Sequence, residues 1–126
     1  MLAARKEFKK LGYKVEYQSI VDYFPIFRGS LQKKLEHASI KSACQGKFDI
    51  VMMAFHHSTS DFCMKLTAEK RAEVLKKIKA HCNTLVWLDT ADSTGTCMFD
   101  VMPYVDLYFK KQVLKNTEDY CRDVYG

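Results

Sequence analysis

The stretch that decides the fold is LVWLDTADSTGT, Leu85 to Thr96. It begins with an apolar run, reaches an acid at Asp89, and continues with small polar residues and one glycine. This pattern is typical of a buried strand of an α/β sheet that ends in a functional loop. We therefore expect a central strand over Thr84–Leu88 and a loop over Asp89–Thr96.

Three other segments have the residue patterns of strands. Phe48–Phe55 is almost continuously apolar, which is typical of a strand covered on both faces. Lys14–Ile20 and Val105–Lys110 alternate polar and apolar residues, as half-exposed strands do. Together with the central strand, these segments predict a sheet of four strands.

Helical periodicity separates the predicted strands. Leu2–Leu11, Ser30–Cys44 and Thr67–His81 each gather apolar residues on one face, and Thr117–Tyr125 does so weakly. For the helix over Thr67–His81 we expect a buried stripe formed by Ala68, Ala72, Leu75, Ile78 and Cys82.

Local signals mark where these helices start and stop. Gly12 is expected to end the first helix in a left-handed conformation, with Tyr13 folding back on the last turn. Thr67 is a suitable N-cap for the third helix. Pro103 is expected to break a short helical turn that starts near Cys97.

The alternation of helices and strands predicts an α/β fold, a three-layer Rossmann-like or flavodoxin-like domain with a mostly parallel sheet. Because the chain opens with a helix where a doubly wound domain opens with a strand, we expect the first strand to be missing. The alternative is a sheet that closes without it. We interpret residues 1–126 as a single Rossmann-like domain, a fragment of a larger two-domain protein. The gap would leave a sheet edge through which two copies could form a dimer.

The composition fits a globular domain in the cytoplasm. Of 126 residues 48% are hydrophobic, and the net charge of +5 is spread as lysine pairs without the dense basic stripe of a nucleic-acid binder. Five cysteines form no CxxC pair, so we expect free thiols rather than a disulfide framework or a zinc site. No apolar run has the length of a membrane span, and no signal peptide is evident.

Polar residues follow the predicted central strands, at the edge where open parallel sheets bind ligands. Some of them are also natural helix caps, which is an equally good interpretation of a polar edge. The residues that the topology would gather there are His56, His57, Ser58, Asp89, Asp92, Ser93, Thr94 and Lys110.

Common catalytic motifs are absent from this group. The loop after Asp89 lacks the spacing of a phosphate-binding Walker loop and the glycines of a dinucleotide fingerprint. His56 and His57 are adjacent, which does not give the spacing of a metal site. Ser58, His57 and Asp89 could form a hydrolase triad, but no GxSxG elbow carries the serine.

Two parts of the chain resemble a known family. Phe48–Val51 leading to His56-His57, and Trp87–Ser93 leading to Tyr104–Lys111, are similar to the N-terminal, acceptor-side Rossmann-like half of GT-B glycosyltransferases. The resemblance is closest to enzymes encoded among bacterial capsule and lipopolysaccharide genes. The opening helix, ending in Leu-Gly-Tyr-Lys-Val, fits the start of that half.

The resemblance implies a function for the full-length protein. It would transfer a sugar from a nucleotide-sugar donor to a cell-surface polysaccharide or lipopolysaccharide acceptor, with peripheral membrane association. The donor would be bound mainly by a C-terminal half, so this chain alone should be inactive. His56 or His57 would be the catalytic position, no metal or other cofactor is expected, and the acceptor-binding residues would be Ser58, Asp89, Asp92, Ser93, Thr94 and Lys110.

Two other functions stay open on the sequence. The chain could be a non-catalytic, flavodoxin-like binding or interaction module. It could also be a small hydrolase or phosphotransfer domain that uses the same edge of the sheet.

Overall fold

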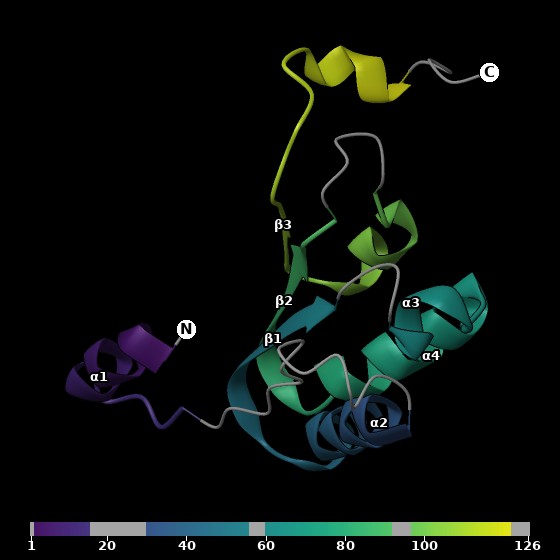
Figure 1. Ribbon diagram of the computed structural model, residues 1–126. Coiled ribbons are helices and arrows are strands. Elements are labelled where there is room, and N and C mark those ends of the chain that lie inside the picture. The colour runs from purple at the N-terminus through teal and green to yellow at the C-terminus, as the bar shows by residue number, and fades with distance from the viewer. Residues whose placement is uncertain (1, 16–29, 56–59, 92–96, 122–126) are drawn as a thin grey trace.

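The computed structural model describes residues 2–15, 30–55, 60–91 and 97–121. Helices and strands alternate through most of this part of the chain (Figure 1). In chain order the elements are α1 (Leu2–Lys10), α2 (Ser30–Gln45), β1 (Phe48–Phe55), α3 (Asp61–Met64), α4 (Ala68–Lys79), β2 (Cys82–Asp89), the 3-10 helix η2 (Phe99–Tyr104), β3 (Leu107–Lys110) and the 3-10 helix η3 (Thr117–Cys121).

The described strands form one open, fully parallel sheet in the order β1-β2-β3. Helix α4 packs against β2, against α2 and against η2, so these helical elements form a layer on one face of the sheet (Figure 1). This is a mixed α/β domain with the open parallel sheet of Rossmann-like and flavodoxin-like proteins. The predicted α/β fold class with a parallel, Rossmann-like sheet is confirmed. Helices α2, α4 and η2 form one helical layer, whereas the predicted three-layer domain has two.

The core lies between this helical layer and the sheet. Leu75 and Ile78 of α4 are fully buried, and they pack in one cluster with Leu85 and Trp87 of β2. The Trp87 ring lies 5.9 Å from the ring of Phe62, measured between centroids. Three members of the predicted stripe, Ala72, Leu75 and Ile78, are therefore confirmed as buried.

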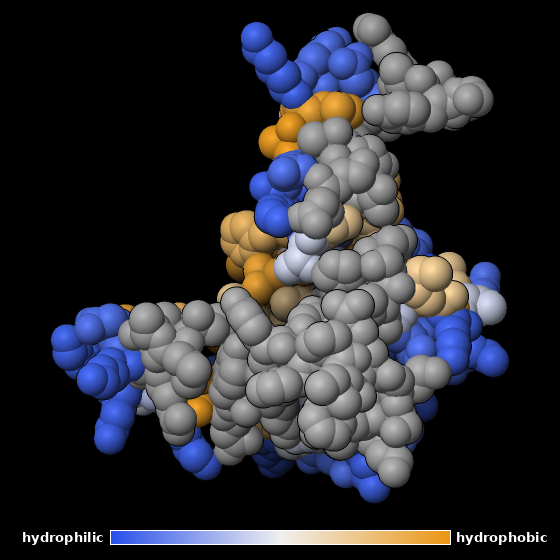
Figure 2. All heavy atoms as spheres, viewed as in Figure 1, coloured by the Kyte–Doolittle hydropathy of each residue, from blue (hydrophilic) through white to orange (hydrophobic). Residues whose placement is uncertain are grey.

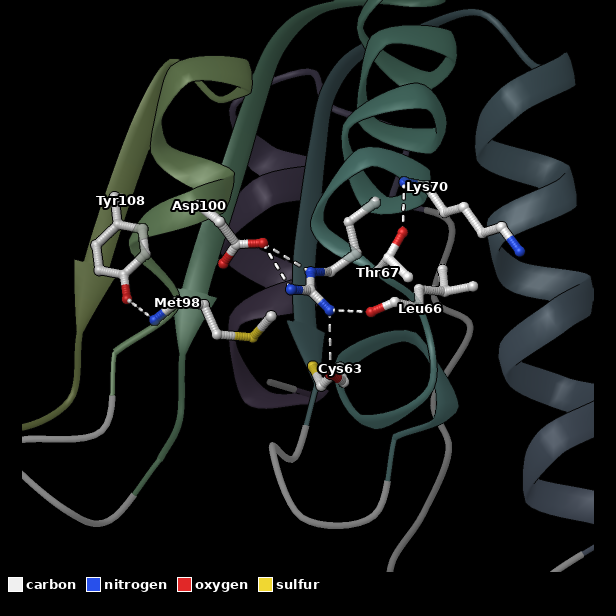
Figure 3. A network of polar contacts seen from close by, with 8 residues as sticks. Cys63, Leu66, Thr67, Lys70, Met98, Asp100 and Tyr108 are labelled. Carbon is white, nitrogen blue, oxygen red and sulfur yellow. Dashed lines mark hydrogen bonds and ion pairs between the residues drawn. The ribbon is translucent and has the colours of Figure 1, made fainter.

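The predicted helix ends are largely confirmed. Gly12 has a φ of 85°, and the amide of Tyr13 donates to the carbonyl of Phe8 at 3.0 Å. Thr67 caps α4, with its hydroxyl accepting from the amide of Lys70 at 3.4 Å (Figure 3). Ala68 is exposed rather than buried, because it occupies the first position of the helix, where the chain enters from solvent.

Two boundaries near β3 differ from the prediction. Pro103 lies inside η2 and does not break it. A short 3-10 helix tolerates one missing donor, and the next turn closes with the amide of Val105 donating to the carbonyl of Met102 at 3.4 Å. Strand β3 starts at Leu107 rather than Val105, because Val105 is the C-cap of η2.

One predicted strand and one predicted helix lie only partly within the described residues. Lys14 and Val15 are not in a strand, and the remainder of the strand predicted over Lys14–Ile20 lies outside the described residues. The helix predicted over Thr117–Tyr125 is the short η3, and residues 122–126 lie outside the described part.

The second face of the sheet is apolar and exposed. Ile50 and Met52 of β1 are 48% and 54% exposed, and Leu107 and Phe109 of β3 are 48% and 54% exposed. The expectation that Phe48–Phe55 is covered on both faces is therefore wrong for this face. Its residue pattern is that of a strand buried on both faces, but in the described part of the chain the helices that pack on the sheet lie on its other side.

A partly buried arginine, Arg71, links the elements of the helical layer. The Nε and Nη2 atoms of Arg71 both lie 2.8 Å from Oδ2 of Asp100 in η2 (Figure 3). Its Nη1 donates to the carbonyl of Cys63 at 3.2 Å and to that of Leu66. One guanidinium thus links α4, the end of α3 and η2, which holds the segments before and after β2 in place.

Candidate binding edge at the carboxyl ends of the strands

The three strands end level with one another at one edge of the sheet. Phe55, the last residue of β1, pairs with Asp89, the last residue of β2, and Asp89 pairs with Lys110, the last residue of β3. In sequence, His56 and His57 directly follow Phe55. The carboxyl ends of the strands therefore converge as predicted for a ligand-binding edge.

Two of the predicted site residues are described, and the sheet brings them together. The Nζ atom of Lys110 lies 3.4 Å from Oδ1 of Asp89. The roles predicted for these two residues as acceptor contacts stay predictions. The other predicted residues, His56, His57, Ser58, Asp92, Ser93 and Thr94, lie outside the described residues.

The Asp89–Lys110 pair is buried and satisfied by its own surroundings. Each side chain is only 5% exposed. The Oδ1 atom of Asp89 accepts from the amide of Ala91 at 3.0 Å, and Nζ of Lys110 donates to the carbonyl of Ala91 at 2.9 Å. The pair thus holds the chain where it leaves β2, in the side-chain-to-backbone turn typical of aspartate.

Tyr108, which sequence reasoning did not single out, completes this cluster. Its hydroxyl donates to Oδ2 of Asp89 and accepts from the amide of Met98 at 3.2 Å (Figure 3). Burial, followed by the hydrogen bond to Asp89, raises the pKa of the Tyr108 phenol well above its usual range. The signal was available in part, since Tyr108 alternates with exposed Leu107 and Phe109 and so faces the same side as Lys110.

The cluster holds both ends of one loop. Ala91 is bound by Asp89 and Lys110, and Met98 is bound by Tyr108. Residues 92–96, which carry three of the predicted contact residues, are the segment between these two anchors. Asp89, Tyr108 and Lys110 therefore fix the chain at Ala91 and at Met98.

A second buried carboxylate anchors the neighbouring loop. Glu36 of α2 is 4% exposed, and its Oε1 accepts from the hydroxyl of Ser60 at 3.0 Å and from the amide of Phe62 at 2.6 Å. Ser60 in turn caps α3, accepting from the amide of Cys63 at 3.3 Å. The segment that contains His56 and His57 therefore runs between the end of β1 and a fixed point at Ser60. Sequence reasoning missed Glu36, because nothing in its own helix indicates a partner 24 residues away.

Removing the Tyr108 hydroxyl should loosen the loop anchor. We expect Tyr108→Phe to lower the free energy of unfolding by about 1.5–3 kcal/mol, because it removes a hydrogen bond to a buried carboxylate. The amide of Met98 should also exchange with solvent faster. Urea denaturation and hydrogen exchange measure the two effects. Tyr13→Phe, at a half-exposed ring that follows α1, is the matched control, and an equal effect of both variants would contradict the anchor.

The opposite end of β3 is stabilised by a different acid. Oδ2 of Asp106 accepts from the amide of Leu85 at 2.6 Å and from Nζ of Lys79. The amide of Leu85, together with Lys79, lowers the pKa of the Asp106 carboxyl below its usual range. This acid ties β3 to β2 and lies away from the carboxyl ends of the strands.

This lowered pKa predicts the direction of a pH effect on stability. The contribution of Asp106 should be present above the ordinary aspartate pKa, about 4, and should be lost as the pH falls through the lower value of the folded state. The gap in melting temperature between the wild type and Asp106→Asn should therefore shrink below about pH 4. Thermal melts between pH 2 and 7 measure it, and a gap that stays constant with pH would exclude this role.

The described residues offer no site for a metal ion. In residues 2–15, 30–55, 60–91 and 97–121, no three His, Cys, Asp or Glu side chains lie together in a suitable arrangement. The cysteines are free thiols, as predicted. Burial raises the pKa of Cys63 to about 11, so this thiol is protonated and unreactive at neutral pH.

Comparisons of the chain with models of protein families, with proteins of known function and with solved structures give no match. Among the described helices, none combines the length and apolarity needed to cross a lipid bilayer.

Proposed function

We propose that this chain is the acceptor-side domain of a GT-B glycosyltransferase and binds a sugar acceptor at the carboxyl edge of its sheet. The observation that carries the proposal is the level ending of three parallel strands, with two loops anchored there by buried carboxylates. Fixed loop ends reduce the ordering that binding requires, which favours recognition of a polar ligand such as a saccharide.

The two histidines would supply the chemistry of this edge. A neutral imidazole of His56 or His57 can accept the proton of an acceptor hydroxyl as that oxygen attacks the anomeric carbon of the donor sugar. The bond from that carbon to the phosphate oxygen breaks, and the nucleotide leaves with the electron pair. Ser58, Asp92, Ser93 and Thr94 would bind the sugar hydroxyls, because hydroxyl and carboxylate groups match their hydrogen-bonding pattern. Asp89 and Lys110 would hold the backbone next to this surface in place through their hydrogen bonds to Ala91. The nucleotide-sugar donor would be bound by a second domain of the full-length bacterial protein.

A second function is favoured by one specific observation. The exposed apolar face of the sheet, defined by Ile50, Met52, Leu107 and Phe109, is typical of a surface that contacts another protein element. A non-catalytic binding or interaction module would use this face and would leave the carboxyl edge without a saccharide ligand. The two functions therefore predict different ligands and different surfaces.

Calorimetric titration separates these proposals. We expect the wild type to bind oligosaccharide fragments of bacterial capsule or lipopolysaccharide, and to bind nucleotide sugars much more weakly. His57→Ala or His56→Ala should weaken saccharide binding about tenfold, the equivalent of one hydrogen bond. His37→Ala is the matched control, because His37 is exposed on α2. Absence of saccharide binding, or equal losses in all three variants, would contradict the glycosyltransferase proposal.

A further inference from the structure

The aromatic ring of Phe99 lies half-exposed in the helical layer. Phe99 is the first residue of η2 and is 48% exposed, whereas Met98 before it and Val101 after it are buried. These two buried neighbours belong to the core cluster and hold the start of η2 against it. The ring of Phe99 therefore presents an apolar surface at a fixed place in the fold.

The connections of η2 place Phe99 next to the carboxyl edge of the sheet. Strands β2 and β3 are parallel, so η2 leads from the carboxyl end of β2 back to the start of β3. The amide of Met98, the residue before Phe99, donates to the hydroxyl of Tyr108 (Figure 3). That hydroxyl in turn donates to Asp89, the last residue of β2. Phe99 is thus one residue away from a direct contact with the group that ends the central strand.

A second aromatic ring supports Phe99. The ring centroids of Phe99 and Tyr108 are 6.5 Å apart, and the ring planes are inclined by 39°. Tyr108 itself packs against the core, and its hydroxyl is held by hydrogen bonds to Asp89 and Met98. Because Phe99 lies against a side chain that is already fixed, it loses little conformational freedom when a ligand binds.

This ring is separate from the apolar face of the sheet. Tyr108 packs against the core on the helical side, so Phe99, which contacts Tyr108, lies on that side as well. The apolar face is on the opposite side of the strands, where Figure 2 shows apolar atoms at the surface away from α3 and α4. A ligand at the carboxyl edge would therefore meet Phe99 and not the apolar face.

An aromatic ring beside a polar edge fits a sugar in its ring form. On one face of many pyranoses the C–H hydrogens form an apolar patch with a partial positive charge. The face of a phenylalanine ring is negative, so the two surfaces attract each other. The hydroxyl groups at the rim of the sugar stay available for hydrogen bonds to polar groups of the edge.

We propose that Phe99 stacks on the acceptor sugar, and that the acceptor is a pyranose with one face that carries only C–H hydrogens. This inference rests on the acceptor-binding function proposed above and specifies its substrate class. A sugar with axial hydroxyl groups on both faces should bind more weakly, because stacking would bury a hydroxyl group without a hydrogen-bond partner.

Calorimetric titration with a lipopolysaccharide-derived oligosaccharide tests the stacking. We expect Phe99→Leu to raise the Kd about threefold to tenfold, because leucine keeps an apolar side chain but has no aromatic face. Phe99→Tyr keeps that face and should stay within about twofold of the wild type. Met102→Ala is the matched control, since Met102 is 47% exposed on the same helix and should also stay within about twofold.

Proton nuclear magnetic resonance of the wild-type complex gives a second readout. Sugar C–H protons that lie over an aromatic ring shift upfield, and they should do so with the wild type and with Phe99→Tyr but not with Phe99→Leu. The absence of upfield shifts in the wild-type complex would overturn the inference even if Phe99→Leu does not fold.

The outcomes separate this inference from the function on which it rests. Oligosaccharide binding that Phe99→Leu leaves unchanged would overturn the stacking and leave the acceptor-binding function standing. No saccharide binding by the wild type would contradict both. If Phe99→Leu weakens the binding of uridine diphosphate but not that of the oligosaccharide, the ring contacts a nucleobase, and the inference is overturned.

Discussion

An Asp89→Ala variant is expected to lose about 3–5 kcal/mol of unfolding free energy. The side chain of Lys110 is 5% exposed, so the substitution leaves a buried cation without its carboxylate. The amide of Ala91 and the hydroxyl of Tyr108 lose their acceptor at the same time. Urea denaturation followed by tryptophan fluorescence measures the loss, because Trp87 lies on the same strand.

Two companion variants show whether the buried pair causes this loss. Glu73→Ala removes an exposed acid from α4 and should change the stability by no more than about 0.5 kcal/mol. Adding Lys110→Met to Asp89→Ala removes the unpaired cation and should recover part of the loss. If Asp89→Ala costs as little as Glu73→Ala, the pair is not the anchor that its geometry indicates.

Leu75→Ala should destabilise the chain by about 2–5 kcal/mol. Leu75 is fully buried where α4 packs on the sheet, in one cluster with Leu85 and Trp87. The truncation removes apolar contacts and leaves a cavity that the surrounding helix and strands can fill only in part. Thermal or urea denaturation measures the change.

Val113→Ala is the matched control for this prediction. Val113 is 59% exposed after β3, so truncating it should change the stability by no more than about 0.5 kcal/mol. Similar losses in the two variants would mean that α4 does not contribute the core of the domain.

The elements with strong local signals could be predicted from the sequence. Helix α4 follows from the periodicity of Ala72, Leu75 and Ile78, and its start from the capping threonine at position 67. Strand β2 follows from its apolar run and the acid that ends it, although the strand starts two residues before the predicted Thr84. In these cases the information lies within a few residues of the feature that it determines.

The polar anchors of the candidate site could not be predicted, because they join distant parts of the chain. Glu36 reaches Ser60 across 24 residues, and Tyr108 reaches Asp89 across 19. Such pairs depend on how the helices pack and on the strand register, which local patterns do not contain. Asp89 was predicted to lie in the loop at the ligand-binding edge. Its burial beside Lys110 depends on the pairing of β2 with β3, which the sequence alone does not reveal.

The apolar pattern on both faces of β1 shows a second limit of prediction from the sequence. A continuous run of apolar residues predicts that both faces of a strand are covered, but it does not say by which element. Here one face lies against α4's layer, and the other presents Ile50 and Met52 to solvent.

The measurement that most directly tests the central claim is nuclear magnetic resonance mapping of a saccharide titration. Binding at the carboxyl edge predicts shifts of the amide signals of Ala91, Met98 and Lys110, which border that edge. The amides of Phe48, Leu85 and Asp106, toward the other end of the strands, should stay unchanged. Shifts confined to that other end, or no shifts with any capsule or lipopolysaccharide fragment, would contradict the account.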